Sequence, residues 1–341
     1  MNKSSKKDVY YIYAPTYVEW SAGIRVLHYL CEELNSNGFE TFMVIHGMGV
    51  HPKVSFSSRS PILTKGILNS HSVNNRRQIA IYPETINGNP MNAPYVIRWL
   101  LNFPNLLGGN KKFNNETIFA YSESIARSYE KFNGTLPDVL FIPAIKSTEI
   151  ESALLNTIER NPGLQVVYAQ KFRALGGKPD TSYENCREIT RFGRAAPKRS
   201  ETLKLIREAE LVHVYENTTV ITEALLFGVP VVCHQNQFFN ELIAKEELGL
   251  DGITWDPNAI QTPNAKMNLE RLKISEKAVK LNIQSLFSDL KIDRMPTFGA
   301  KGIILPKNGV WTKHSVSRGF QVLTQKGPIV FLRFLKNYMG R

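Results

Sequence analysis

Long apolar runs, paired cysteines and a recognisable leader are the features that this sequence lacks. Its 341 residues include three cysteines, Cys31, Cys186 and Cys233, and their spacing matches no metal-binding pattern. We therefore expect reduced thiols and a cytoplasmic protein. No apolar run reaches the length of a membrane span, and the basic start is followed by a strand-like segment instead of a leader's apolar region.

Internal repeats, low-complexity tracts and motifs that recognise DNA or RNA are also missing. The charge is strongly one-sided, because 42 lysines and arginines face 30 acidic residues, which gives a net charge of +12. Such a balance favours anionic partners, namely nucleotides or phospholipid surfaces. The basic residues are spread along the chain, so we expect no nucleic-acid partner, and a solvated surface accounts for most individual lysines.

The periodicity predicts two successive α/β halves. A β-prone run at 9–14, a helical pattern at 21–38 and a second β-prone run at 39–45 form a β-loop-α-β unit, which predicts a parallel sheet. Further strands are predicted at 79–82, 117–121, 139–142, 164–169, 211–215 and 229–233. Helices are predicted at 93–101, 146–161 and 199–208, and residues 183–197 are predicted to form a loop.

We place the hinge between Pro143 and Gly163, where the alternation restarts. The predicted domains are 1–150, 151–315 and a separate basic amphipathic segment at 316–341. That last segment mixes basic and large apolar residues, and Pro328 is compatible with the first turn of a helix. It is either a helix that packs onto the first domain, which we favour, or an interfacial helix that contacts an anionic bilayer.

The most informative segment is 213–232. It predicts a strand end, a polar turn at Asn217, Thr218 and Thr219, a short helix stopped by Gly228, and another buried strand. A helix N-terminus at the carboxyl end of a strand is where α/β proteins bind phosphate. Glu223, one turn into the helix, can accept hydrogen bonds from ribose hydroxyls. The same pattern also suits an ordinary structural unit, in which the glutamate favours the helix dipole.

The run from Asn217 to Val232 resembles the donor-site segment of GT-B-fold glycosyltransferases. The resemblance implies that the turn, with Thr218 and Thr219, holds a donor diphosphate and that Glu223 holds the ribose. It also implies a catalytic role for the upstream glutamate, Glu216. The gap between the two glutamates is one residue shorter here than in the family pattern.

Two segments of the first half resemble parts of the same enzymes. The segment 14–25 resembles the N-terminal loop of the GT-B fold, which implies that Gly23 approaches the donor phosphates and Glu19 the acceptor. A plain helix cap at Ser21 is compatible with this role. The segment 82–104 resembles a group of bacterial glycosyltransferases. Glu84 and Asn89 are candidates for acceptor binding or catalysis, and we assign catalysis to Glu84 and acceptor binding to Asn89 and Arg98. A rigid turn without a ligand is the alternative.

Cations follow the first predicted strand of the second half. GT-B enzymes place positive charge here to neutralise the donor diphosphate, and the nearest matches are Lys171 and Arg173, with Lys178 behind them. Fixed cations and a helix N-terminus stabilise a leaving diphosphate without a metal. Thr190 lies in a loop that borders the nucleotide base in related enzymes. Exposed loop cations without a ligand are the alternative.

Together these resemblances imply a GT-B glycosyltransferase with two Rossmann-like domains that face a cleft. The expected donor is a nucleoside-diphosphate sugar of the UDP or GDP type, with hexosyl transfer to a glycan or lipid-linked acceptor. The expected role is in bacterial surface polysaccharide, either lipopolysaccharide or capsule, beside the inner membrane. No cofactor or metal is expected, because no Asp-x-Asp motif occurs in a suitable loop. The alternatives are a sugar-nucleotide epimerase of similar fold and a non-enzymatic protein that binds anions or membranes.

Overall fold

The computed structural model describes residues 8–46, 60–106, 109–155, 158–190, 197–249, 251–288, 290–295 and 302–306. These residues form two compact units, each with its own parallel sheet. The first unit contains the described residues up to Ala144 and those from Glu276 onward, and the second contains Ile145–Ser275. The expectation of an α/β fold with two parallel sheets is confirmed. The segment at 316–341 lies outside the described residues.

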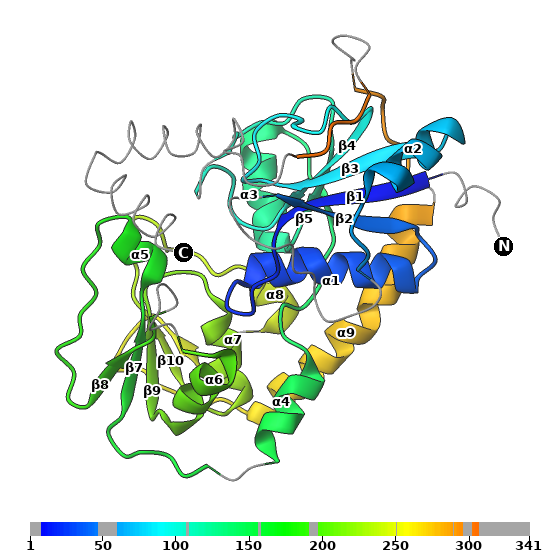
Figure 1. The fold of residues 1–341 in the computed structure, drawn as a ribbon. Helices are drawn as coiled ribbons and strands as arrows, with labels where there is room; N and C mark the ends of the chain where they lie inside the picture. The colour runs from blue at the N-terminus through cyan, green and yellow to red at the C-terminus, as the bar shows by residue number, and fades with distance from the viewer. Residues whose placement is uncertain are drawn as a thin grey trace. The chain divides into compact units, whose positions relative to one another are not determined.

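The first unit is built on a six-stranded parallel sheet of order β2-β1-β3-β4-β5-β6 (Figure 1). The strands are β1 (Asp8–Pro15), β2 (Thr41–His46), β3 (Arg77–Pro83), β4 (Tyr95–Leu100), β5 (Thr117–Ala120) and β6 (Asp138–Val139). The helices are α1 (Ala22–Ser36), α2 (Lys65–Val73) and α3 (Glu123–Asn133). The strand, helix and strand predicted at the start of the chain are thus confirmed.

Both faces of this sheet are buried. Alternate residues of β1 point to opposite faces, so Ile12 packs in one apolar cluster with Leu27 and Leu30 of α1. Tyr11 packs in a second cluster on the other face with Ala80. A parallel sheet covered on both faces requires strands that are apolar throughout, as β1 is.

The helix predicted at 93–101 is wrong, because this segment is the central strand β4. It pairs in parallel with β3 on one side and β5 on the other. Val96, Ile97 and Trp99 are all fully buried. A short apolar run buried on both faces has no alternation to distinguish it from a buried helix, so periodicity alone misassigned it.

The second unit contains a five-stranded parallel sheet of order β11-β10-β9-β7-β8. The strands are β7 (Gln165–Tyr168), β8 (Cys186–Glu188), β9 (Leu211–Val214), β10 (Val231–Cys233) and β11 (Ile253–Thr254). The helices are α4 (Ser147–Leu154), α5 (Gln170–Ala174), α6 (Arg199–Glu208), α7 (Thr219–Leu226) and α8 (Lys245–Leu248). The helix predicted at 199–208 and the strands predicted around β7, β9 and β10 are confirmed.

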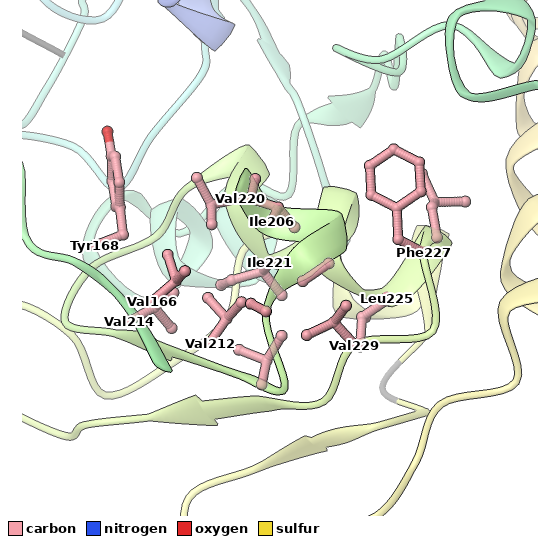
Figure 2. Close-up of a cluster of buried hydrophobic side chains, with 14 of the residues drawn as sticks. Val166, Tyr168, Ile206, Val212, Val214, Val220, Ile221, Leu225, Phe227 and Val229 are labelled. Atoms are coloured by element: carbon pink, nitrogen blue, oxygen red, sulfur yellow. The ribbon is translucent and has the colours of Figure 1, made fainter. Parts of the chain in front are cut away.

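The core of the second unit lies between this sheet and helices α6 and α7, as Figure 2 shows. Ile206 of α6 and Ile221 of α7 meet Val212 and Val214 of β9 in one buried cluster. Each such aliphatic side chain contributes about 1.5–3 kcal/mol when it is fully buried. This packing fixes the position of α7 against the strand that precedes it.

Two predictions for the second unit need correction. The helix predicted at 146–161 ends at Leu154, and Arg160 lies outside it. The Arg160 guanidinium donates through Nη2 to the carbonyl oxygen of Gly228 at 2.5 Å, just beyond the end of α7. The predicted loop at 183–197 contains the short strand β8, which pairs with β7. Neither long-range contact leaves a local sequence signal.

The long helix α9 (Ala265–Ser288) belongs to both units. Its Leu272 packs in the core of the second unit. Further along, Val279, Ile283 and Phe287 pack in the core of the first unit beneath β1. The Phe287 ring lies edge-on to Tyr10 with centroids 5.4 Å apart. The sequence analysis did not predict this helix.

Candidate functional site

Each sheet has a switch point, a place where successive strands continue toward opposite sides. In the second sheet the chain runs from β7 outward to β8, whereas β9 continues to β10 and β11 on the other side. The switch point therefore lies between β7 and β9, which are adjacent and parallel. Ligands of open α/β sheets bind at the carboxyl ends of the strands that flank such a point. The segments that leave these ends are α5 and the turn before α7.

The turn before α7 is the one predicted from the sequence. Thr218 is the N-cap residue, and its Oγ1 accepts a hydrogen bond from the Val220 amide at 3.3 Å. Asn217 is fixed to the segment after β10, because its Nδ2 donates to the Glu241 carbonyl at 2.8 Å and its Oδ1 accepts from the Ile243 amide at 2.9 Å. The N-terminus of α7, with its partial positive charge, is thus rigidly placed at the switch point.

Lys171 connects the two segments that flank the switch point. Its Nζ donates to the carbonyl oxygen of Asn217 at 2.9 Å and lies 3.8 Å from Oε1 of Glu216. The Lys171 side chain is 39% exposed. A partly exposed ammonium group therefore lies directly beside the helix that the sequence assigns to phosphate binding.

Glu216 has a structural role in this unit. Its Oε2 accepts hydrogen bonds from the backbone amides of Lys171 and Phe172, the latter at 2.9 Å. The carboxylate thus closes the first turn of α5, and the residue is 5% exposed. The Glu216 carboxylate is thus held by amides of its own chain, and the catalytic role implied by the resemblance stays a prediction.

Glu223 lies beneath the surface, in an ion-pair cluster. Its side chain is 0% exposed, and Oε1 accepts a hydrogen bond from Nη1 of Arg199 at 2.7 Å. Arg199 also donates through Nε and Nη2 to the two carboxylate oxygens of Glu149, the second bond at 2.9 Å. Burial alone would lower the pKa of Arg199, but the neighbouring carboxylates of Glu223 and Glu149 raise it above its ordinary value. The Glu223 carboxylate is thus held inside the unit, and the ribose-binding role implied for it stays a prediction.

The other predicted donor residues lie near the same edge but are more exposed. Arg173 forms a two-bond ion pair with Glu188, at 2.6 Å and 2.8 Å, and this hydrogen bonding raises the pKa of Arg173. Lys178 and Thr190 are exposed on the segments that follow α5 and β8. Among these cations, Lys171 is the one that contacts the turn before α7.

The first sheet has its switch point between β1 and β3, since β1 continues to β2 on one side and β3 to β4 on the other. The loops that leave these two strands are the ones that sequence analysis singled out. Glu19, in the loop after β1, is exposed. Gly23 is half-buried, and a Cβ at this position would make only ordinary contact, 3.9 Å from Leu101 Cδ1. Packing therefore does not require glycine here.

Ser21 occupies the N-cap position of α1 but makes no side-chain cap hydrogen bond. Only its carbonyl oxygen continues the helix pattern, by accepting from the Arg25 amide at 2.9 Å. The predicted capping position is confirmed, whereas the expected capping contact is not formed. The serine therefore adds little to the fixation of this loop.

The loop after β3 is held by buried polar groups. Arg98 is 0% exposed and donates to both carboxylate oxygens of Glu116, at 2.7 Å and 2.9 Å. The remaining bonds go to loop carbonyls, namely Pro83 at 3.2 Å, Ile86 at 2.6 Å and Gly88 at 2.9 Å. The guanidinium thus donates to Glu116 and to carbonyls at 83–88, and the acceptor-binding role expected for Arg98 stays a prediction.

Glu84 and Asn89 brace the same loop. Glu84 is 2% exposed, and its Oε2 accepts from the Leu101 amide at 2.9 Å. The Oδ1 of Asn89 accepts from the Tyr82 hydroxyl at 2.8 Å and from the Ala93 amide at 2.9 Å. Both residues therefore brace the loop, and the role in catalysis expected for Glu84 stays a prediction.

A stack of rings that sequence analysis did not predict covers the other face of β9. His213 Nδ1 and His234 Nε2 are 2.9 Å apart in a hydrogen bond. Tyr183 stacks on His213 with centroids 4.1 Å apart, and Tyr215 stacks on His234 at 4.3 Å. Burial, and secondarily the neighbouring His234, lowers the pKa of His213 to about 4. Burial also lowers the pKa of His234, so both imidazoles are neutral at neutral pH and one ring donates to the other.

Comparisons with known proteins found no matching family model and no matching curated protein. Three similar solved structures are a trehalose-6-phosphate protein from E. coli bound with UDP-2-fluoro glucose, a single-residue variant of Os79 from O. sativa with UDP, and the pneumococcal O-GlcNAc transferase GtfA with UDP and GlcNAc. Their TM-scores are 0.45, 0.39 and 0.38, at identities of 10%, 10% and 8%. The matches cover 84%, 82% and 98% of this chain and 100%, 92% and 99% of the other chains. Similarity this low carries no functional conclusion for the chain.

Within the described ranges, no helix is long and apolar enough to cross a membrane. In the same part of the chain, no group of three or more histidine, cysteine, aspartate or glutamate side chains is arranged to hold a metal ion.

Proposed function

We propose that this protein is a nucleotide-sugar-dependent glycosyltransferase of the GT-B type, with its donor site at the switch point of the second sheet. The observation that carries the proposal is the contact between Lys171 Nζ and the Asn217 carbonyl oxygen at 2.9 Å. This contact joins a partly exposed cation to the N-terminus of α7, between the two strands where an α/β sheet binds ligands. The resemblance of 217–232 to a donor-site segment supports the same location.

The donor diphosphate binds the turn at Asn217, Thr218 and Thr219 in this proposal. Negative charge grows on the leaving diphosphate as the glycosidic bond breaks, and preorganised positive groups stabilise it. Lys171 and the dipole of α7 supply this charge directly. Arg173 and Lys178 add positive charge at the edge, so we propose transfer without a metal. Because Thr190 follows β8, we place the base, of the uracil or guanine type, beside it.

The acceptor binds the loops at the switch point of the first sheet. The loop after β3 is a rigid platform braced by Arg98 and Glu84, and the loop after β1 presents the exposed carboxylate of Glu19. We propose a glycan or lipid-linked acceptor and hexosyl transfer in bacterial surface-polysaccharide synthesis. The resemblance of 82–104 to bacterial glycosyltransferases supports this role. The net charge of +12 is compatible with an acceptor at an anionic inner-membrane surface.

Isothermal titration of the full-length protein with UDP and with GDP tests the donor site. We expect one of them to bind, and we expect Lys171→Met to weaken its binding by about tenfold, because a charge-assisted bond to phosphate is lost. Lys204→Met is the matched control, since the Lys204 side chain is 65% exposed on α6. Failure of wild-type protein to bind either nucleotide, with or without Mg²⁺, would rule out the proposed function.

A further inference from the structure

Glu149, Arg199 and Glu223 bring together three helices of the second unit. Glu149 lies on α4, Arg199 begins α6 and Glu223 lies on α7, one turn after the proposed diphosphate turn. We propose that these three residues form a positioning unit for that turn, and that Glu223 acts through Arg199 and α7 instead of binding the ribose itself. This inference rests on the proposed function, and it departs from the role implied by the resemblance.

The first argument for this proposal is the burial of the Glu223 side chain. A ligand-binding carboxylate must present an oxygen to the ligand, whereas the Glu223 side chain is 0% exposed and Arg199, itself 9% exposed, lies against Oε1. Removing a carboxylate from water costs several kcal/mol unless a cation compensates for the loss of hydration. Arg199 is that cation. The pair is therefore built into the interior of the unit.

The second argument for this proposal is the way in which the Arg199 guanidinium divides its bonds between two carboxylates. Its Nε and Nη2 are both engaged by Glu149, which leaves the Nη1 edge directed at Glu223. Glu149 thereby sets the orientation of Arg199, and Arg199 sets the position of Glu223. A planar guanidinium can hold two carboxylates at fixed angles, because its N–H donors point in fixed directions. A lysine ammonium supplies the same charge but not this fixed arrangement of donors.

The third argument for this proposal is the position of Glu223 in α7. Thr218 caps this helix and Glu223 lies one turn further, on the same rigid element. Ile221 and Leu225 bury one side of α7 in the apolar core, and the ion pair fixes the helix through Glu223. A shift of Glu223 would therefore move the first-turn amides that we assign to the diphosphate.

The test uses isothermal titration of full-length protein with UDP and with dideoxy-UDP, which lacks both ribose hydroxyls, or with the matching GDP pair if GDP is the nucleotide bound. The variants are Glu223→Gln, Arg199→Met and Arg199→Lys. We expect Arg199→Met to weaken both ligands by the same factor, about tenfold, because the buried carboxylate of Glu223 and the half-buried one of Glu149 lose their partner. Glu223→Gln weakens both equally but less, and Arg199→Lys restores part of the loss. The double variant Arg199→Met with Glu223→Gln loses less than the sum of the two single changes.

A direct ribose contact predicts a different pattern. Glu223→Gln would then weaken the binding of UDP and leave the binding of dideoxy-UDP unchanged. That result, or unchanged binding of both ligands, overturns the inference but not the proposed donor site. Absence of wild-type binding to any of the four nucleotides overturns the proposed function and the inference together. Arg127→Met, at a 61% exposed arginine of α3, is the control. If thermal melting shows that Arg199→Met is unfolded, Glu149→Gln, at a side chain 31% exposed, replaces it and must weaken both ligands equally.

Discussion

The loops at the two switch points are fixed by buried arginines of different kinds. Arg98 in the first unit binds one carboxylate, 18 residues away, and carbonyls of its own loop no more than 15 residues away. Arg199 in the second unit binds two carboxylates, 50 and 24 residues away, on two other helices. The first arginine builds a loop, whereas the second joins separate elements. We therefore expect the first to control stability above all, and the second to control the geometry of a binding turn.

Loss of Arg98 gives the largest expected effect. Arg98→Met leaves Glu116 buried without its cation and removes the side-chain donor of three carbonyls, of which only that of Pro83 keeps a backbone donor among the described bonds, so we expect the free energy of unfolding to fall by about 3–5 kcal/mol. Urea unfolding of the full-length protein measures this change. A value near that of the surface control Arg127→Met would break the comparison, because Arg98 would then not hold the first unit together.

Gly109 tests through the backbone whether the loop that Arg98 braces controls the stability of the protein. It has a φ of +92°, and a Cβ here would lie 2.0 Å from the carbonyl oxygen of Glu84, in the loop that Arg98 braces. We expect Gly109→Ala to destabilise the protein by about 2–4 kcal/mol, from backbone strain and overlap together. Gly134→Ala is the matched control, since Gly134 also has positive φ but nothing within 4 Å. Equal losses in the two variants would show that the contact with Glu84 contributes nothing.

Each unit contains a buried histidine that should make the free energy of unfolding depend on pH. Burial lowers the pKa of His28 in the first unit and of His213 in the second to about 4, below the unfolded value of 6.5. The unfolded chain binds more protons between these values, so this stability is complete above pH 6.5 and is lost as the pH falls toward 4.

We expect His213→Gln to flatten the pH dependence of the unfolding free energy more than His28→Gln. His213 Nε2 donates to Gln165 Oε1 at 2.8 Å, so Nδ1 is the atom that accepts from His234, and a proton on Nδ1 would remove this acceptor. Burial lowers the pKa of His234 as well, although Asp180 nearby partly favours the charged forms. Urea unfolding at pH 7 and pH 5 measures both slopes. The reverse order would place the acid-sensitive element in the first unit.

Glu19 gives the smallest expected effect. Its carboxylate is exposed, so Glu19→Gln should leave the unfolding free energy unchanged and raise the KM for the acceptor by about two- to fivefold, as expected for one exposed charge. Steady-state transfer assays with varied acceptor measure this change. An increase in the KM for the donor alone would assign this loop to the other substrate.

The segment around α7 shows what sequence could predict. The capping residue Thr218, the helix and the strand after Gly228 all depend on local propensities, and all three are confirmed. Gly228 has a φ of +70°, the left-handed conformation expected at a helix end. Local chemistry of this kind is readable because the interacting groups lie within one or two turns of each other.

The roles of the glutamates could not be predicted in the same way. Glu216 binds amides 44 and 45 residues earlier, and Glu223 pairs with an arginine 24 residues earlier. Such contacts depend on the order of strands in the sheet, because β7 and β9 become neighbours only after β8 is placed at the edge. A motif can therefore predict the local structure of a segment correctly and still not reveal the distant partners of its side chains.

The shared helix α9 has a consequence for how the protein is made. Phe287 packs against Tyr10, Phe39 and Phe119, which all precede the second unit, yet it is synthesised after the segment Ile145–Ser275 of that unit. A nascent chain that has emerged only as far as Ala144 contains the whole first sheet but lacks part of its core. During synthesis, the rings of Tyr10, Phe39 and Phe119 therefore lack the partner that covers them in the finished protein. The first unit can complete its core only after α9 has been synthesised.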